Sequence, residues 1–394
     1  MTPADSRLYP RGVTAAPSHR RFSLGPRTAA VALCTLLALD LWALSSADPD
    51  YYFPDLFRPL AAVAIVLLLA SGFIRRAGPR RAVRALLLML VGSVLILEVR
   101  TRYRDIIDDE RIEMTGDALL RYHYRPGIES SEPLPTGGRL RVSSLGFIDL
   151  ERAIPKPADV YRVVVLTGSI GNDERIPFDD RFWRQLERQL QAERPSGIPP
   201  GKRIEVANVS CDGWSTVQQV RALEKIGLKL SPDAVVLAYM LSSASLQNGA
   251  YRRFGNSFFL FRFMPLLKRL RTGSMCSLFQ PFHETWAFHL IVRNSFERLD
   301  LLRRLHGFRV LVAVLPIVED PDDPLCARLY DQVANTAREV GFPVVRAVDA
   351  FRGLTVAQIA KPNREMDVCH PNSEGHRRIA GAIAEGIRGL VAAP

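Results

Sequence analysis

The chain has 394 residues and a formal net charge of +11, and it is long enough for more than one structural unit. The charge is concentrated near the N-terminus, where residues 1–27 carry a net +4 and residues 75–84 a net +5. Both clusters flank apolar segments, so they indicate membrane topology rather than a surface that follows phosphates. We therefore expect no nucleic-acid partner.

Three apolar segments crowd the first hundred residues, at about 28–44, 57–74 and 82–97. Each is close to the ~17–25 residues that a helix needs to cross a bilayer. Their apolar character on all sides and their arginine-rich flanks favour membrane spans over buried helices of a soluble domain. We expect a cytoplasmic basic tail at 1–27, three transmembrane helices at 28–98, and the lipid bilayer as a partner.

The arginine clusters also predict the orientation of these spans. Basic loops stay in the cytoplasm, whereas the loop after the first span carries Asp48, Asp50 and Asp55 and is expected outside. Three spans then place everything after about residue 98 on the outer side, periplasmic or extracellular. A cleaved signal peptide ending near 45–47 is an alternative for the first span, and it leaves the large domain on the same side.

Residues 99–158 are expected to connect the membrane to the outer domain. Residues 99–125 have mixed charges and predict a helix leaving the membrane, and residues 126–158, rich in Pro, Gly and Ser, predict a linker that wraps onto the domain. One or two disulfides are possible in the outer region, but the sequence does not set the pairing. The cysteines concerned are Cys211, Cys276, Cys326 and Cys369.

Residues 159–394 alternate between strand and helix patterns. Short runs rich in Val, Ile and Leu predict buried strands at 161–166, 204–209, 234–239, 310–315 and 344–348. Helical patterns lie at 180–193, 216–228, 285–306, 325–340 and 373–392. Repeated strand–helix units predict a parallel sheet with helices on both faces, which binds ligands at the carboxyl ends of its strands. Ser169, Gly213 and Ser242 each follow a predicted strand.

Ser169 and the sequence Asp367-Val368-Cys369-His370 are candidates for nucleophilic catalysis. A serine hydroxyl is a weak nucleophile and needs a base within hydrogen-bond reach, which His370 can supply. Asp367, three residues earlier, can hold the imidazole in the right tautomer. A possible helix start at 171–173 would favour a developing oxyanion near Ser169. A metal site at 367–376 fits no common zinc pattern, so we expect no metal and no cofactor.

From about Leu140 onwards the chain resembles membrane-anchored SGNH (GDSL-like) hydrolases. Ordered blocks carry the resemblance: Arg141–Phe147, Thr167-Gly168-Ser169, Asn208–Thr216, Pro232–Leu237, and Asp367-x-x-His370-Pro371-Asn372 with Glu374-Gly375-His376. It implies a three-layer α/β/α flavodoxin-like domain that hydrolyses or transfers acyl groups through an acyl-enzyme. Ser169, His370 and Asp367 would be catalytic, and Ser169, Gly213 and Ser242 would form the oxyanion hole. Implied substrates are ester-bearing polysaccharides or lipids of the cell envelope.

Two blocks depart from the family pattern. Thr167-Gly168 replaces Gly-Asp before the nucleophile, and Leu241-Ser242-Ser243 stands where the family has Asn-Asp. Losing one oxyanion donor typically costs about 10²–10³ in rate. A catalytically degenerate domain that serves as a membrane-anchored binding or assembly module therefore stays open. A Ser169 hydroxyl far from the His370 ring, or a site filled by Cys369 or Trp214, would favour that alternative.

The segment 249–283 combines phenylalanines with arginines and lysines. This composition is typical of an amphipathic cap packed on the domain. The alternative is a contact with the membrane surface or a lid over an acyl chain.

Overall fold

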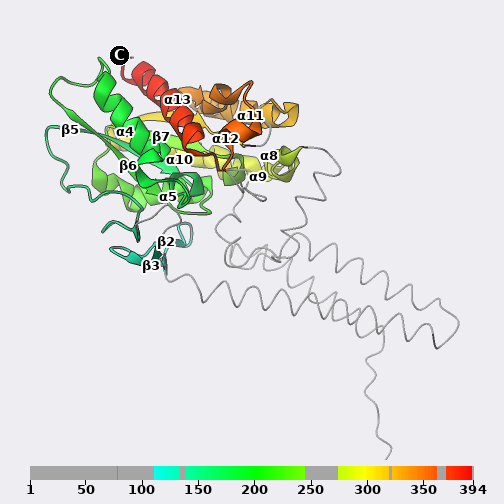
Figure 1. The fold of residues 1–394 in the computed structure, drawn as a ribbon, viewed down its shortest axis with the longest axis horizontal. Coiled ribbons are helices and arrows are strands. Elements are labelled where there is room, and N and C mark those ends of the chain that lie inside the picture. The colour runs from blue at the N-terminus through cyan, green and yellow to red at the C-terminus, as the bar shows by residue number, and fades with distance from the viewer. Residues whose placement is uncertain are drawn as a thin grey trace, which may run out of the picture. The chain divides into compact units, whose positions relative to one another are not determined.

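The computed structural model describes residues 78, 111–133, 139–244, 274–318, 322–361 and 370–392 (Figure 1). All of them except residue 78 belong to one compact unit. Within these ranges no helix is long and apolar enough to cross a membrane. The spans predicted at 28–98, most of the segment 249–283, Asp367 and Cys369 lie outside the described residues.

The core of the unit is a five-stranded parallel sheet in the order β6-β5-β7-β8-β9. Its strands confirm the five predicted runs: β5 (Val160–Thr167), β6 (Arg203–Ser210), β7 (Ala234–Tyr239), β8 (Arg309–Val314) and β9 (Val344–Arg346). The chain moves from β5 to β6 on one side and then crosses to β7 on the other. In such sheets ligands bind at this switch point, in the crevice beyond the carboxyl ends of the strands.

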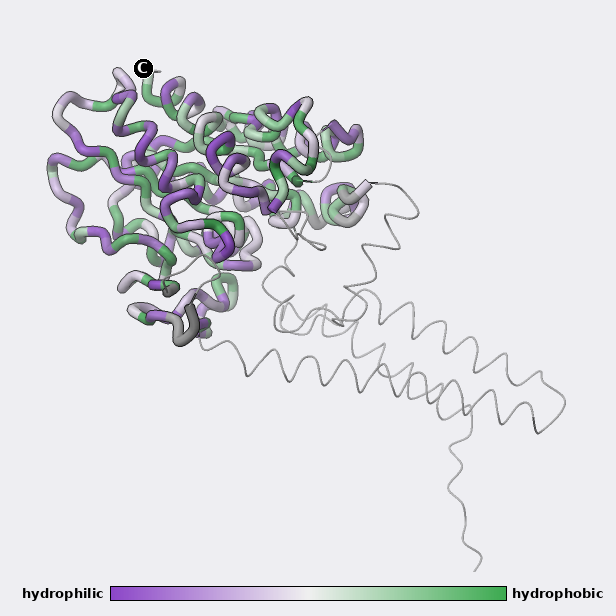
Figure 2. The backbone as a smooth tube through the Cα atoms, viewed as in Figure 1, coloured by the Kyte–Doolittle hydropathy of each residue, from purple (hydrophilic) through white to green (hydrophobic). Residues whose placement is uncertain are grey.

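Helices cover both faces of the sheet, as predicted. Because side chains alternate along a strand, Val163 and Val165 of β5 face one hydrophobic cluster, whereas Val164 and Leu166 face the other. The first cluster contains side chains of α4 (Phe182–Glu193) and α13 (Ser373–Ala392), which pack against each other (Figure 1). The second contains side chains of α5 (Thr216–Lys225), α10 (Asn294–His306) and α11 (Pro324–Val340). Figure 2 shows hydrophobic stretches in the interior and hydrophilic residues on the outer turns.

The helix ends follow local capping signals. Ser215 and Gln218 form a capping box at the start of α5, and α10 and α11 end at Gly307 and Gly341 in the left-handed conformation. The helix predicted at 216–228 ends early and gives way to a 3-10 turn at Gly227–Leu230. The pattern at 285–306 is divided into α9 (Trp286–Phe288), a π turn and α10. Short helices α8 (Gln280–His283) and α12 (Val356–Ile359) complete the described set.

The segment that precedes the sheet differs from expectation. The helix predicted over 99–125 is wrong for its described part, which forms an antiparallel hairpin of β1 (Ile112–Met114) and β2 (Tyr122–Tyr124). The two tyrosines of β2 alternate inwards and are buried, and this alternation favours a strand. A second hairpin pairs β3 (Glu129–Pro133) with β4 (Arg139–Arg141).

Residues 111–133 and 139–158 help to position the carboxyl edge of the sheet. Leu140 and Phe147 are buried in the same cluster as β5 and α5, so this segment contributes to the packed core. The Tyr122 hydroxyl donates to the Asp212 carbonyl at 2.9 Å, and the Trp214 indole donates to the Tyr122 carbonyl at 3.0 Å. The first hairpin thus fixes the loop that follows β6.

Candidate active site

Ser169 lies at the carboxyl end of the sheet, two residues after β5. It begins a 3-10 turn, Ser169–Gly171, closed by a hydrogen bond from the Asn172 N–H to the Ser169 carbonyl at 3.0 Å. The helix start predicted at 171–173 is wrong, because α4 begins only at Phe182. Among the described residues, the Ser169 turn (residues 169–173) therefore has no long helix directly behind it.

The structure brings Ser169 and His370 together across 201 residues of sequence. The His370 Nε2 atom lies 2.8 Å from the Ser169 Oγ atom, and both residues are partly buried. This is the distance expected between a nucleophile and its general base. Ser169 and His370 are the predicted catalytic residues that the structure describes. Asp367 lies outside them, so its role stays a prediction.

The residues that follow His370 are held by hydrogen bonds to residues 358–360. Pro371 forms an antiparallel bridge with Ala360, and the Asn372 amide donates to the carbonyls of Gln358 and Ala360 at 3.0 and 3.2 Å. The Asn372 carbonyl oxygen of the side chain also accepts from the Gly375 N–H in the first turn of α13. These contacts fix the position from which His370 reaches the serine.

The other two predicted oxyanion residues follow the neighbouring strands. Gly213 lies after β6 with φ of 76°, in the left-handed region that favours glycine. Ser242 is half-buried in the 3-10 turn Leu241–Ala244 after β7. With Ser169 after β5, all three lie at the carboxyl edge around the switch point. Their role as hydrogen-bond donors to an oxyanion stays a prediction.

A buried polar network that the sequence did not predict supports the Ser169 turn. The Asn172 Oδ1 atom accepts hydrogen bonds from the Asn208 amide at 3.0 Å and from the Ser210 hydroxyl at 2.8 Å. The Trp183 indole of α4 donates to the Gly171 carbonyl at 2.9 Å. The available signal was a pair of polar residues at alternate positions, 208 and 210, on the same strand face as the apolar Ile204 and Val206. The network ties the turn to β6 and α4.

Gly171 allows the Ser169 turn to pack this closely. A Cβ atom at this position would lie 2.6 Å from the Thr167 methyl group and 3.0 Å from the Asn208 Oδ1 atom. Real Cβ atoms essentially never approach a neighbour as closely as the first distance. The absence of a side chain at 171 is therefore a steric requirement of the turn.

An ion pair between Lys361 and Asp173 was also missed by sequence reasoning. The Lys361 ammonium contacts the Asp173 Oδ2 atom, and the two side chains are only 7% and 3% exposed. Burial would raise the pKa of Asp173, but the charge of His370 and the hydrogen bond from Lys361 outweigh it and hold the pKa below its ordinary value. The carboxylate therefore stays charged beside the candidate base.

His376 has the structural role that the sequence favours. It is fully buried on α13, its Nδ1 atom accepts a hydrogen bond from the Phe182 N–H at 3.1 Å, and its ring stacks on that of Phe182. Burial lowers its pKa to about 3, so the ring is neutral at ordinary pH. His376 therefore links α13 to the start of α4 without adding a charge near His370.

The Trp214 side chain is buried in the core and does not fill the site around Ser169. Its indole is 1% exposed, bonds to the Tyr122 carbonyl and meets the Phe147 ring edge-on at 6.2 Å. It is thus packed in the core beneath the first hairpin. Together with the short Ser169–His370 distance, this packing supports the catalytic interpretation over the degenerate one.

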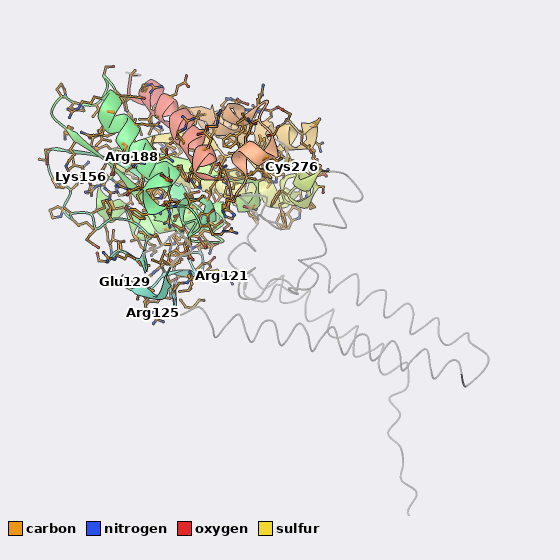
Figure 3. The ribbon with its side chains drawn as sticks, viewed as in Figure 1. Arg121, Arg125, Glu129, Lys156, Arg188 and Cys276 are labelled. Atoms are coloured by element: carbon orange, nitrogen blue, oxygen red, sulfur yellow. A yellow bond between two sulfur atoms is a disulfide. The ribbon has the colours of Figure 1, made fainter. Side chains whose placement is uncertain are left out.

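The structure also resolves one of the open disulfide questions. Cys276 and Cys326 are bonded, with Cα atoms 5.3 Å apart (Cys276 is labelled in Figure 3). The bond joins the 3-10 turn Met275–Leu278 to the first turn of α11. Cys211 is buried after β6, and Cys369 lies outside the described residues.

A cavity of about 510 Å³ lies at the opposite, amino-terminal edge of the sheet. Its lining includes Lys156, Tyr161, Asp233 and Arg309 near the starts of β5, β7 and β8. Its cations already have partners, since Lys156 contacts Asp233 at 2.5 Å and Arg309 donates to the Leu390 carbonyl at 2.6 Å. In Figure 3 Lys156 lies far from Cys276, across the domain. This cavity is not part of the serine site.

No family model and no curated protein matches the chain. Solved structures described as hydrolases or esterases share a partial likeness. An α/β hydrolase enzyme from the metagenome of Lake Arreo, Spain, is 18% identical, with a TM-score of 0.40 over 59% of this chain and 96% of that chain. The acetylxylan esterase Axe2 from Geobacillus stearothermophilus is 17% identical, with a TM-score of 0.38 over 58% and 94%.

The psychrotrophic esterase EstA from Pseudoalteromonas sp. is 12% identical, with a TM-score of 0.36 over 59% of this chain and 98% of that chain. At these identities and TM-scores the likeness assigns no activity to this chain. An activity is inferred instead from the arrangement of Ser169 and His370.

Proposed function

We propose that this chain is a serine esterase or O-acyltransferase that works through an acyl-enzyme on Ser169. The observation that carries the proposal is the 2.8 Å distance between the Ser169 Oγ and the His370 Nε2 atoms. It occurs at the carboxyl edge of a parallel sheet, beside the switch point between β5 and β7 where such sheets bind ligands. The sequence resemblance to SGNH hydrolases is an independent support.

The proposed reaction has two matched halves. As the Ser169 oxygen attacks the ester carbonyl, His370 takes the hydroxyl proton and then gives it to the departing alcohol. The acyl group is left on Ser169. Water or an acceptor hydroxyl then attacks this ester, again losing its proton to His370, and Ser169 recovers its proton as it leaves. Transfer differs from hydrolysis only in the second nucleophile.

The remaining predicted residues have supporting roles in this proposal. Asp367 would hold the imidazole in the tautomer that leaves Nε2 free to accept a proton. The backbone N–H groups of Ser169 and Gly213 and the hydroxyl of Ser242 would donate to the oxyanion. A hydroxyl in place of an amide is a shorter and more mobile donor, so we expect a slower reaction than in an enzyme with asparagine at this position.

The proposed setting is the outer face of a membrane, with residues 28–98 as the anchor and the bilayer as partner. The Cys276–Cys326 disulfide supports this location, because disulfides persist in oxidising compartments and are rare in the cytosol. The basic clusters at 1–27 and 75–84 support the same orientation. The proposed substrates are ester-bearing polysaccharides or lipids of the envelope.

The direct test is labelling of the purified full-length chain with a fluorophosphonate, which reacts with activated serines. We expect labelling of the wild type and its loss in Ser169→Ala and His370→Ala. Matched controls are Ser196→Ala and His306→Ala, which change exposed residues of the same types. A folded wild-type protein that is not labelled would refute the proposed activity and favour the binding or assembly module.

A further inference from the structure

Among the described residues, side-chain contacts join the Ser169 turn to the segment that carries His370. One is the contact between Ser169 and His370 itself. The other is the ion pair between Asp173, at the end of the turn, and Lys361. Lys361 directly follows Ala360, which is bridged to Pro371, the residue after His370. The ion pair therefore lies one residue from the Ala360–Pro371 bridge, next to His370.

The ion pair is built into the interior. Asp173 and Lys361 are 7% and 8% exposed as whole residues, and the Asp173 Oδ1 atom also accepts from the Arg175 N–H at 3.1 Å. A buried charge whose partner is removed is strongly destabilising, so the two residues depend on each other. Nothing in the proposed chemistry of Ser169 and His370 requires a lysine at 361, so the pair calls for a separate explanation.

We propose that Lys361 and Asp173 are a positioning pair that holds the His370 segment against the Ser169 turn and sets the negative charge that His370 faces when it takes the serine proton. The proposal rests on the proposed function of Ser169 and His370. Neither residue of the pair is expected to touch the substrate. Asp173 acts through His370, and Lys361 acts through Asp173.

The charges around His370 predict the direction in which each substitution shifts the pH profile. The Asp173 carboxylate favours the protonated imidazole, whereas Lys361, by pairing with that carboxylate, weakens its effect. His376, on α13, also interacts with His370 but is neutral because it is buried. Arg175 lies 3.6 Å from Asp173 and is half exposed, so solvent screens it, and Arg181, at the start of α4, acts on Asp173 from further away. Asp367 precedes His370 by three residues and is common to all variants below.

The test is the rate of fluorophosphonate labelling of the full-length chain as a function of pH. Asp173→Asn removes the negative charge, so we expect the acidic limb of the profile to move to lower pH by about one unit. Lys361→Met frees the carboxylate, and we expect the limb to move to higher pH by a similar amount. Loss of the contact is expected to lower the plateau rate about tenfold or more in both, because small displacements of catalytic groups are costly.

Controls separate positioning from general damage. Asp179→Asn removes an exposed carboxylate nearby and is expected to leave the profile unchanged. The double variant Asp173→Asn/Lys361→Met contains no unpaired buried charge, so it tests the proposal even if a single variant does not fold. The acidic limb of the double variant's pH profile is expected to lie between those of the two single variants. Its plateau labelling rate is expected to be lower than that of the wild type.

Two outcomes would overturn the proposal. One is that the acidic limb stays in place in both single variants, or moves in the same direction. The other is a folded double variant that reacts at the wild-type plateau rate. In contrast, a folded wild-type chain that is not labelled at any pH would refute the proposed function itself. The two failures are therefore distinguishable.

Discussion

Replacing Gly171 with alanine is expected to damage both stability and reactivity. The added Cβ atom would meet the Thr167 methyl group at 2.6 Å, the Asn208 Oδ1 atom at 3.0 Å and the Ser210 hydroxyl at 3.1 Å. Thr167 is a buried β-branched residue of β5, and the other two side chains are held in the network around Asn172. Asn208 and Ser210 cannot move away without breaking contacts that support the Ser169 turn, and Thr167 has no exposed space to move into because it is fully buried.

Overpacking of a buried site typically costs about 1–3 kcal/mol, and we expect this loss in the free energy of unfolding. Because the clash lies two residues from Ser169, we also expect the labelling rate to fall by up to about 10²-fold, as displacements of about 1 Å can cause. The measurements are urea unfolding and fluorophosphonate labelling of the full-length chain.

Gly381→Ala is the matched control for this substitution. Gly381 lies within α13, and an added Cβ atom there would meet nothing within 4 Å. Alanine is a better helix former than glycine, so this variant is expected to gain up to about 1 kcal/mol with an unchanged labelling rate. A Gly171→Ala variant with the stability and the labelling rate of the wild type would contradict the close packing of the Ser169 turn against β5 and β6.

Three further outcomes follow from the described contacts. Asn172→Ala leaves one buried N–H of the Asn208 amide without its acceptor, whereas the Ser210 hydroxyl can still donate to the Asn208 Oδ1 atom, so urea unfolding should show a loss of about 1–3 kcal/mol; an unchanged midpoint would contradict the network. Replacing Cys276 and Cys326 together by serine opens a link across 50 residues and should lower the free energy of unfolding by about 2–4 kcal/mol, and a stability insensitive to reductant would argue against the bond. Burial lowers the pKa of His283 to about 4 and that of His376 to about 3, so below about pH 6.5 the unfolded chain binds protons that the folded chain does not. The contribution of these two histidines to the free energy of unfolding should therefore fall as the pH decreases from 6.5 towards 3, and the slope of stability against pH should change between the wild type and His376→Asn by the share of His376.

Much of the sheet was predictable because its strands are short, continuous apolar runs. Val163 to Leu166 are buried on both faces, and this burial is what such a run indicates. The parallel order then places residues that follow each strand at one edge, so Ser169 could be predicted there before any contact was known. The helix α13 was predicted to the residue, since its apolar periodicity is long and Ser373 marks its start.

The parts that were missed depend on tertiary contacts rather than on local pattern. The strands β1 and β2 have three residues each, too few for a periodic signal; β2 accepts a hydrogen bond from the Trp214 indole at Tyr122, and β1 pairs with β2. The 3-10 turn at Ser169 replaced a predicted helix start because Gly171 packs against β6. The partners Lys361 and Asp173 are 188 residues apart, and no spacing rule links them.

In the proposed mechanism Ser169 carries an acyl group during turnover, with His370 as its base. The measurement is brief incubation of the full-length chain with p-nitrophenyl acetate, followed by acid quenching and mass analysis of its peptides. We expect release of p-nitrophenolate and an acetyl group on the peptide that contains Ser169, with both absent in His370→Ala. A folded wild-type chain that releases no p-nitrophenolate, or that is acetylated at another residue, would contradict it.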